Sequence, residues 1–292
     1  MAQQIELDDS ARADSGAGED GTHQVAPDVA YQRLAIVNCA FVGLPNSRDW
    51  VLIDAGTMGS AGLIVGAAQK RFGDAPPRAI VMTHGHFDHF GALETLAQKW
   101  QVPVWVHPLE APYFNGSASY PPPDPGVGGG MMAILSPLYP RGPVDVTSHL
   151  QMLPSDGSVP PLSGWKWIHT PGHTPGHVSF FRESDRTLIV GDAFITTAQE
   201  SAYSVAVQKS EMHGPPMYFT QDFDESKHSV DVLAALEPEI AVVGHGLAMR
   251  GPELRAALHQ LSSDFYQVAV PHDGDYVKHP AKVEDGSAYD AA

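Results

Sequence analysis

Residues 83–91 read THGHFDHFG and directly follow the apolar run RAIVM. This short segment contains His84, His86, Asp88 and His89. A buried polar tip needs a hydrogen-bond partner, so such a cluster adds little to a hydrophobic core. A tight loop that leaves a buried strand can aim these side chains at one small volume, and neutral imidazoles with a carboxylate are ligands that zinc and related metals prefer. The segment is therefore either a solvated polar loop or a metal site at the end of a strand.

The charge and cysteine content limit the partners and the chemistry of the chain. Its 17 Lys and Arg residues against 34 Asp and Glu residues give a formal net charge of -17. Such a surface repels phosphate backbones and anionic membranes, so we expect a small-molecule substrate and neither a nucleic-acid nor a membrane partner. Cys39 is the single cysteine of the sequence, so histidine and carboxylate side chains must supply any metal ligands.

The chain divides into a central domain with a polar segment at each end. Residues 1–28 are acidic, small and polar, and we expect them to form a disordered acidic tail. Residues 29–270 are predicted to form a single domain, and residues 271–292 a C-terminal tail. No apolar run reaches the roughly eighteen residues of a membrane span, and the N-terminus lacks the order of a secretory signal. The predicted location is therefore cytoplasmic.

Strand and helix patterns alternate along the central domain, which predicts a layered α/β or α+β architecture. Strands are predicted at 31–43, 50–56, 79–83, 102–107, 165–170, 177–183, 186–194 and 239–246, and helices at 58–72, 91–100, 108–114, 224–236 and 252–268. Residues 115–163 interrupt this order with stretches too rich in proline and glycine for regular elements. An insert of that length is expected to be a functional lid or disordered.

Other polar groups stand at the ends of apolar runs further along the chain. In HTPGHTPGHVSFF, His173 lies in a turn ahead of an apolar strand; LIVGDAF ends a buried strand on Asp192, and AVVGHG ends another on His245. Strand ends of a layered fold can converge on one site, so we expect these side chains to meet the cluster at 84–89.

Together these motifs resemble those of the metallo-β-lactamase-fold hydrolases, because THGHFDH, TPGHTPGH, VGDAF and VVGHG occur in that order within residues 30–268. The resemblance is nearest to the lactonase and glyoxalase-II-like branch. It implies an α+β fold, a four-layer αββα sandwich, with two metals along one edge of the sheets. The ligand sets that it implies are His84, His86 and His173 for one metal, Asp88, His89 and His245 for the other, and Asp192 between them.

The resemblance also implies the chemistry. The cofactors would be two divalent ions, with Zn2+ favoured and iron or manganese as alternatives. Cations about 3.5–4 Å apart can share a bridging hydroxide that is nucleophilic near neutral pH and can polarise a substrate carbonyl. Asp88 is the predicted catalytic residue, which would orient the hydroxide or give a proton to the leaving group. Asp54 is expected to brace the ligands from outside, and His177 to hydrogen-bond locally rather than replace His173.

Details of the motifs narrow the activity within this varied superfamily. Flavodiiron proteins typically carry Glu where this chain has His86, true β-lactamases usually lack the equivalent of Asp192, and the nucleases carry added domains. These departures favour hydrolysis of an ester or lactone of a small apolar or acyl-bearing substrate. The lactonases often have a tyrosine where this chain has Ile195, so another donor, such as Tyr203 or Tyr218, would have to take its place.

The insert supplies candidate substrate contacts. Its apolar residues include Met131 and Tyr139, which could cover the metal edge as a lid, form a homodimer contact, or simply pack on the sheet. The predicted substrate contacts are Ile195, His213, Tyr218, Met131 and Tyr139.

Other functions remain open at this level. A hydroxyacylglutathione hydrolase-like thioesterase is one, although few basic residues follow His245 to bind a charged tripeptide. A mononuclear iron sulfur dioxygenase is another, because that branch also uses the H-x-H-x-D-H pattern. The third is a metal-binding protein whose site is structural or sensory.

Overall fold

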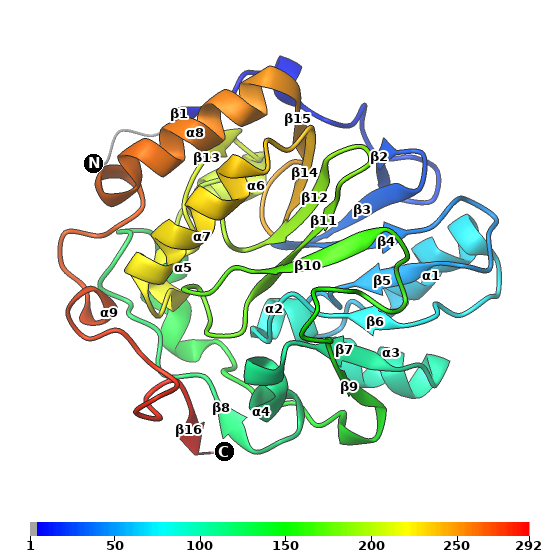
Figure 1. Ribbon diagram of the computed structural model, residues 1–292, viewed down its shortest axis with the longest axis horizontal. Coiled ribbons are helices and arrows are strands. Elements are labelled where there is room, and N and C mark those ends of the chain that lie inside the picture. The colour runs from blue at the N-terminus through cyan, green and yellow to red at the C-terminus, as the bar shows by residue number, and fades with distance from the viewer. Residues whose placement is uncertain (1–4, 292) are drawn as a thin grey trace.

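The computed structural model describes residues 5–291, and within them two β-sheets form the centre of the molecule (Figure 1). The larger sheet has the strand order β2 (His23–Ala26), β3 (Val29–Leu34), β4 (Val37–Val42), β5 (Val51–Ile53), β6 (Ile80–Val81), β7 (Val104–Val106) and β9 (Leu150–Met152). The smaller sheet has the order β10 (Trp165–His169), β11 (Val178–Arg182), β12 (Thr187–Gly191), β14 (Ile240–Val243) and β15 (Met249–Arg250).

Alternation along the strands divides the apolar side chains between two faces of each sheet. On β5, Val51 and Ile53 lie in the cluster between the sheets, whereas Leu52 packs on the outer face. On β12, Ile189 points between the sheets and Leu188 outward. All five are buried, and full burial of such a side chain contributes about 1.5–3 kcal/mol. Both faces of each sheet therefore need a cover.

Helices cover the outer faces. The helices α1 (Ala61–Phe72) and α3 (Leu93–Trp100) share a buried cluster with the larger sheet, and α7 (Phe223–Ala235) and α8 (Gly251–Val268) share one with the smaller sheet. In Figure 1 the blue-cyan and the yellow-orange helices flank the strands on opposite sides. This arrangement is the predicted four-layer αββα sandwich, so the predicted fold class is confirmed.

Parallel strands place the polar motifs at one edge. In the larger sheet β6 runs parallel to β5 and β7, and in the smaller sheet β12 runs parallel to β14. The motif THGHFDH follows β6, Asp192 follows β12, and His245 follows β14. The carboxyl ends of parallel strands meet at the same edge of a sheet, so these loops converge there.

The remaining helices and strands of the described residues are short. The helices are α2 (Phe87–Phe90), α4 (Ala111–Phe114), α5 (Met131–Leu135), α6 (Ala202–Val207) and α9 (Asp275–Lys278). The strands β1 (Ile5–Glu6) and β13 (Glu211–Met212) pair with each other, as do β8 (Ala118–Ser119) and β16 (Asp290–Ala291).

The predicted disordered tail at 1–28 is wrong for residues 5–28, which are ordered and packed; residues 1–4 lie outside the described part of the chain. Ile5 and Leu7 are buried against the smaller sheet's helices, and β2 joins the larger sheet. The acidic charge is also accommodated, since Asp14 accepts hydrogen bonds from Tyr31 Oη at 2.7 Å and from His23 Nδ1 at 3.0 Å. The prediction failed because the few apolar residues that pack on the domain are surrounded in the sequence by acidic and small polar residues.

The insert and the C-terminal tail also contain regular structure. Leu150–Met152, inside the segment predicted to be irregular, forms β9 and pairs in parallel with β7. The C-terminal tail packs on the insert: β16 pairs with β8, and Asp290 accepts a hydrogen bond from Arg141 at 2.6 Å. Among residues 5–291, no helix combines the length and the apolar composition needed to cross a bilayer.

Candidate metal centre

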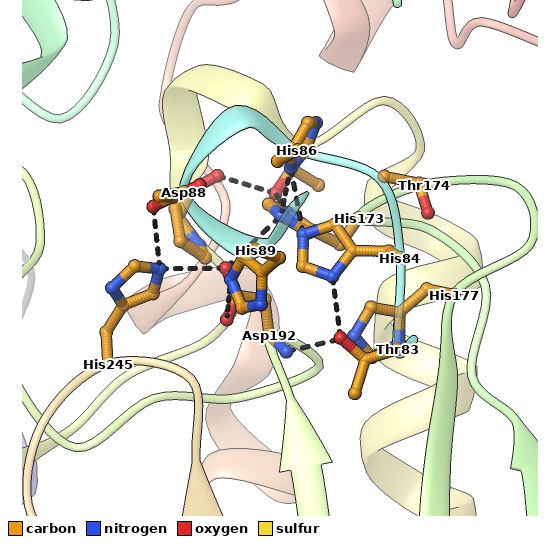
Figure 2. Close-up of polar contacts among 12 residues, drawn as sticks. Thr83, His84, His86, Asp88, His89, His173, Thr174, His177, Asp192 and His245 are labelled. Atoms are coloured by element: carbon orange, nitrogen blue, oxygen red, sulfur yellow. Dashed lines mark hydrogen bonds and ion pairs between the residues drawn. The ribbon is translucent and has the colours of Figure 1, made fainter. Parts of the chain in front are cut away.

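All the predicted ligands lie together where the two sheets meet at this edge. Figure 2 shows the rings of His84, His86 and His173 directed toward one another. His86 Nδ1 lies 3.0 Å from His84 Nε2 and 2.9 Å from His173 Nε2. His84 and His86 lie on the loop that leaves the larger sheet after β6, and His173 lies on the loop between β10 and β11 of the smaller sheet. The sandwich therefore brings together His86 and His173, which are 87 positions apart in the sequence.

A second group lies beside the first. Asp88, His89 and His245 each offer a ligand atom, and these atoms lie within 4.8 Å of one another. Asp192 contacts both groups: its Oδ2 lies 3.4 Å from His173 Nε2 and 3.0 Å from His245 Nε2, and its Oδ1 lies 3.4 Å from His89 Nε2. The structure thus sets the predicted bridging carboxylate between the two groups of predicted ligands.

Local backbone features make this close approach possible. His86 precedes α2 in an extended conformation, and the helix carries Asp88 and His89 on consecutive residues. Gly244 packs directly against the side chains of Asp192 and His89, because a Cβ added there would stand 1.9 Å from Asp192 Oδ1 and 3.0 Å from His89 Cε1. Any larger residue at 244 would displace a predicted ligand.

Hydrogen bonds from outside fix the ring tautomers of the larger-sheet histidines. Asp54 accepts from His89 Nδ1 at 2.8 Å and from Thr83 Oγ1 at 2.8 Å. Because the Thr83 hydroxyl donates to Asp54, it accepts from His84 Nδ1 at 3.0 Å. Both rings therefore carry their proton on Nδ1 and turn the Nε2 lone pair inward. Asp54 has the bracing contacts predicted from the sequence.

The same logic holds on the smaller sheet. His245 Nδ1 donates to the carbonyl of Ile36 at 2.6 Å. The Thr220 hydroxyl donates to the carbonyl of Pro216 at 2.8 Å, so it accepts from His173 Nδ1 at 3.3 Å. The Nε2 atoms of His245 and His173 also face the cluster, the direction from which a metal would be bound.

His177 has the local role predicted for it. Its Nε2 accepts the backbone N–H of Asp192 at 2.9 Å, and its Nδ1 donates to Thr170 Oγ1 at 2.8 Å. Both ring nitrogens are used, whereas His173 directs Nε2 at His86. His173 is therefore the histidine of this motif that faces the cluster, and His177 holds Asp192 in place from behind.

Burial favours neutral imidazoles in the three-histidine group, whereas the Asp192 carboxylate raises the pKa of His89 and His245 against the effect of burial. Burial lowers the pKa of His84 and His86 well below the usual range and that of His173 to about 3. Burial would raise the pKa of Asp192, but the neighbouring His245 and His89 hold it well below its usual range. Neutral imidazoles next to a carboxylate form a donor set suited to a divalent cation.

Unpaired buried atoms test whether a metal fits here. Among the described residues, His89 Nε2 and Asp192 Oδ1 are buried without a hydrogen-bond partner. Such atoms cost roughly 1–3 kcal/mol each when unsatisfied. The Nε2 atoms of His84 and His173 are both acceptors, and the single proton that His86 Nδ1 can carry satisfies only one of them. The residues present therefore fit divalent cations.

An apolar group of side chains, here named the cover cluster, closes over the metal centre. It consists of Phe87, Val127, Met132, Ala133, Tyr139, Met217, Tyr218 and Phe219. Phe219 stacks on His86 with ring centroids 4.7 Å apart, and Phe87 stacks on Tyr139 at 5.0 Å. The cluster draws on α2, on the insert at 115–163 and on residues 217–219.

The predicted substrate contacts divide into those inside and outside this cover. Tyr218 and Tyr139 belong to the cover cluster, and burial together with the Asp88 carboxylate raises the pKa of both hydroxyls. Met131 is 62% exposed, and its neighbour Met132 packs in the cluster instead.

The other two predicted contacts are held by a backbone pairing. Ile195 is fully buried and exchanges backbone hydrogen bonds with His213, whose Nε2 lies 3.4 Å from Glu211 Oε2. Tyr203, considered as a replacement hydroxyl donor, is 73% exposed. Tyr218 is therefore the better placed of the two tyrosines that could supply a donor in place of Ile195.

Sequence patterns missed Glu110, which is buried behind the cluster and accepts hydrogen bonds from the loops that carry His84, His86 and His173. The one feature of the sequence that could have indicated Glu110 is its position shortly after the apolar strand β7. The partners lie far away along the chain, so no local pattern reveals them.

Comparison with known proteins agrees with this geometry. The sequence model of the metallo-beta-lactamase superfamily matches residues 33–245. The Bacillus subtilis protein "Probable metallo-hydrolase YflN" is 48% identical over 85% of this chain and 94% of its own length. The Haemophilus influenzae protein "Hydroxyacylglutathione hydrolase GloC" is 25% identical over 58% of this chain and 70% of its own length.

The fold of this chain is also similar to that of a solved structure. The crystal structure of a beta-lactamase domain protein from Burkholderia ambifaria has a TM-score of 0.60 to this chain, with 20% identity over 89% of this chain and 80% of that one. At this identity the likeness concerns the fold.

Proposed function

Because this chain belongs to the metallo-beta-lactamase superfamily and is a metallo-hydrolase, we propose that it cleaves an ester or lactone bond of a small apolar or acyl-bearing substrate with two divalent ions, preferably Zn2+. The observation that carries this proposal is the inward direction of the Nε2 lone pairs of His84, His89, His173 and His245, each set by a hydrogen bond on the opposite nitrogen.

The proposed ligand sets follow the two groups. His84, His86 and His173 would hold one ion, and Asp88, His89 and His245 the other, with Asp192 shared. When bound, two such ions supply a nucleophile at neutral pH and stabilise the developing oxyanion.

Asp88 has the catalytic role in this proposal. It is buried in α2, and its Oδ2 lies 3.6 Å from His245 Nε2. Burial raises the pKa of its carboxyl group, so it is able to take a proton and release it to a leaving alkoxide. It would also orient the attacking group by accepting a hydrogen bond from it.

The cover cluster supports an apolar substrate. Phe219, Met132 and Tyr139 place aromatic and thioether surface against the metal edge, which can bind an acyl chain or a ring. The Tyr218 hydroxyl belongs to the same cluster and would donate a hydrogen bond to the substrate carbonyl, the task for which Ile195 has no donor.

Thioester hydrolysis is the second candidate, favoured by the likeness to GloC. A glutathione thioester would need basic side chains near the site. Arg255 instead pairs with Glu239 at 2.6 Å, and Lys278 with Asp273 at 3.2 Å. These pairings favour the uncharged ester or lactone.

The test is turnover of a panel of lactones, aryl esters and acyl-glutathione thioesters before and after removal of metal with a chelator. We expect hydrolysis of a lactone or an aryl ester that the chelator abolishes and added Zn2+ restores, with slower thioester turnover. Absence of metal-dependent hydrolysis across the panel would contradict the proposal. Oxygen uptake by protein with one iron per chain would instead favour the sulfur dioxygenase.

A further inference from the structure

Glu110 is the buried carboxylate that the proposed chemistry does not use. It lies at the end of the 3₁₀ helix Pro108–Glu110, directly after β7, and is 1% exposed. Each of its oxygens accepts from one backbone N–H and one hydroxyl. Oε1 accepts from Gly176 N at 2.9 Å and Thr174 Oγ1 at 2.8 Å; Oε2 accepts from Gly85 N at 3.0 Å and from the Tyr120 hydroxyl.

Three of these donors, Gly85, Thr174 and Gly176, lie on the two loops that form the three-histidine group. Gly85 stands between His84 and His86, on the loop that leaves the larger sheet. Thr174 and Gly176 follow His173, on the loop between two strands of the smaller sheet. Glu110 therefore ties together the loops whose nitrogens meet at 2.9 Å, between His86 Nδ1 and His173 Nε2.

Gly176 leaves room for the Glu110 side chain. A Cβ added at Gly176 would stand 2.7 Å from Glu110 Cγ and 2.9 Å from its Oε1. A side chain there would push the carboxylate away from the loop. The close approach of Glu110, and not a turn alone, thus explains the glycine of the second TPGH motif, Gly176.

Tyr120 extends the same unit toward the ligands. Its hydroxyl lies 2.9 Å from Gly85 N, and its ring packs against the His86 ring with centroids 4.5 Å apart. The hydroxyl and ring together hold His86 on one side, while Phe219 stacks on His86 with a centroid separation of 4.7 Å. The orientation of His86 therefore depends on Tyr120, whose hydroxyl donates to Glu110.

We infer that Glu110 is a positioning residue that sets the spacing of the three-histidine group across the two sheets, and so sets the affinity and coordination geometry of the ion held there. The inference rests on the proposed function, because it assigns a metal to this group. Both carboxylate oxygens are required: glutamine has one oxygen, so its amide NH2 would face the backbone N–H of either Gly85 or Gly176, a donor that cannot accept from it.

The test compares Glu110→Gln with Glu94→Gln, which changes an exposed glutamate in the first turn of α3. Co2+ affinity is measured in the full chain by competition with a chromophoric chelator, and the visible absorption of the Co2+-saturated protein is recorded. We expect Glu110→Gln to weaken Co2+ binding about 10–100-fold and to shift the absorption bands. Glu94→Gln should match the unmodified chain in both readouts.

If Glu110→Gln fails to fold, Tyr120→Phe removes one donor and keeps the carboxylate. It should weaken Co2+ binding in the same direction by a smaller factor. Wild-type affinity and an unshifted spectrum in the folded variant would overturn the inference, as would a variant that loses thermal stability but keeps the spectrum. Failure of the unmodified chain to bind Co2+ would contradict the proposed function, and this inference with it.

Discussion

An Asp192→Asn variant is expected to lose about 10³-fold or more of kcat/KM, or about 4 kcal/mol of transition-state stabilisation. Asp192 contacts both predicted ligand groups through its two oxygens. Asparagine keeps the shape but offers one neutral oxygen, and its NH2 group would point a donor at one group. We therefore expect the variant to hold fewer ions as well as to hydrolyse more slowly.

The measurement is kcat/KM on the best substrate of the panel, together with the metal content of each variant. Asp74→Asn, an exposed aspartate outside the centre, is the matched control and should keep both values. His177 accepts the backbone N–H of Asp192 rather than its side chain, so the loop should keep its conformation in the variant. Full activity of a folded Asp192→Asn protein would show that the bridge is not needed.

Replacing Asp88 with asparagine is expected to lower kcat about 10²–10³-fold, with little effect on folding. The substitution is close to isosteric, and Asp88 accepts no hydrogen bond from another side chain among those found in the described residues. What it removes is the group that we propose takes up and releases a proton beside His245.

This variant also separates the catalytic proposal from a purely structural or sensory metal site. A structural site predicts that the variant loses stability but changes no chemistry. The test is kcat beside the midpoint of urea unfolding for the variant and the unmodified chain. A stable Asp88→Asn protein with unchanged kcat would contradict the catalytic role.

The candidate ligands could be predicted from the sequence because each of them stands next to a recognisable apolar strand. His84, His86 and His89 follow an apolar strand, and Asp192 and His245 each end another. The alternation that separates Val51 from Leu52 predicts strands buried on both faces, and covering helices follow from that. Local patterns predicted a layered α/β or α+β domain, and the four αββα layers were expected from the resemblance of the motifs to those of the metallo-β-lactamase-fold hydrolases.

Other features depend on contacts between distant segments. Ile5 and Leu7 are two apolar residues in an acidic stretch, and their burial depends on partners more than two hundred positions away, such as Met212 opposite Ile5. Glu110 accepts from Gly85, Tyr120 and Gly176, none of which its own neighbourhood indicates. Long-range hydrogen bonds of this kind leave no periodic trace in a sequence.

The central claim is that the cluster around Asp192 holds two catalytic ions. The most direct measurement is the number of Zn2+ ions per chain, by inductively coupled plasma mass spectrometry of protein reconstituted with Zn2+ and freed of excess metal. Two ions per chain are predicted. A value of one or zero would contradict the dinuclear centre.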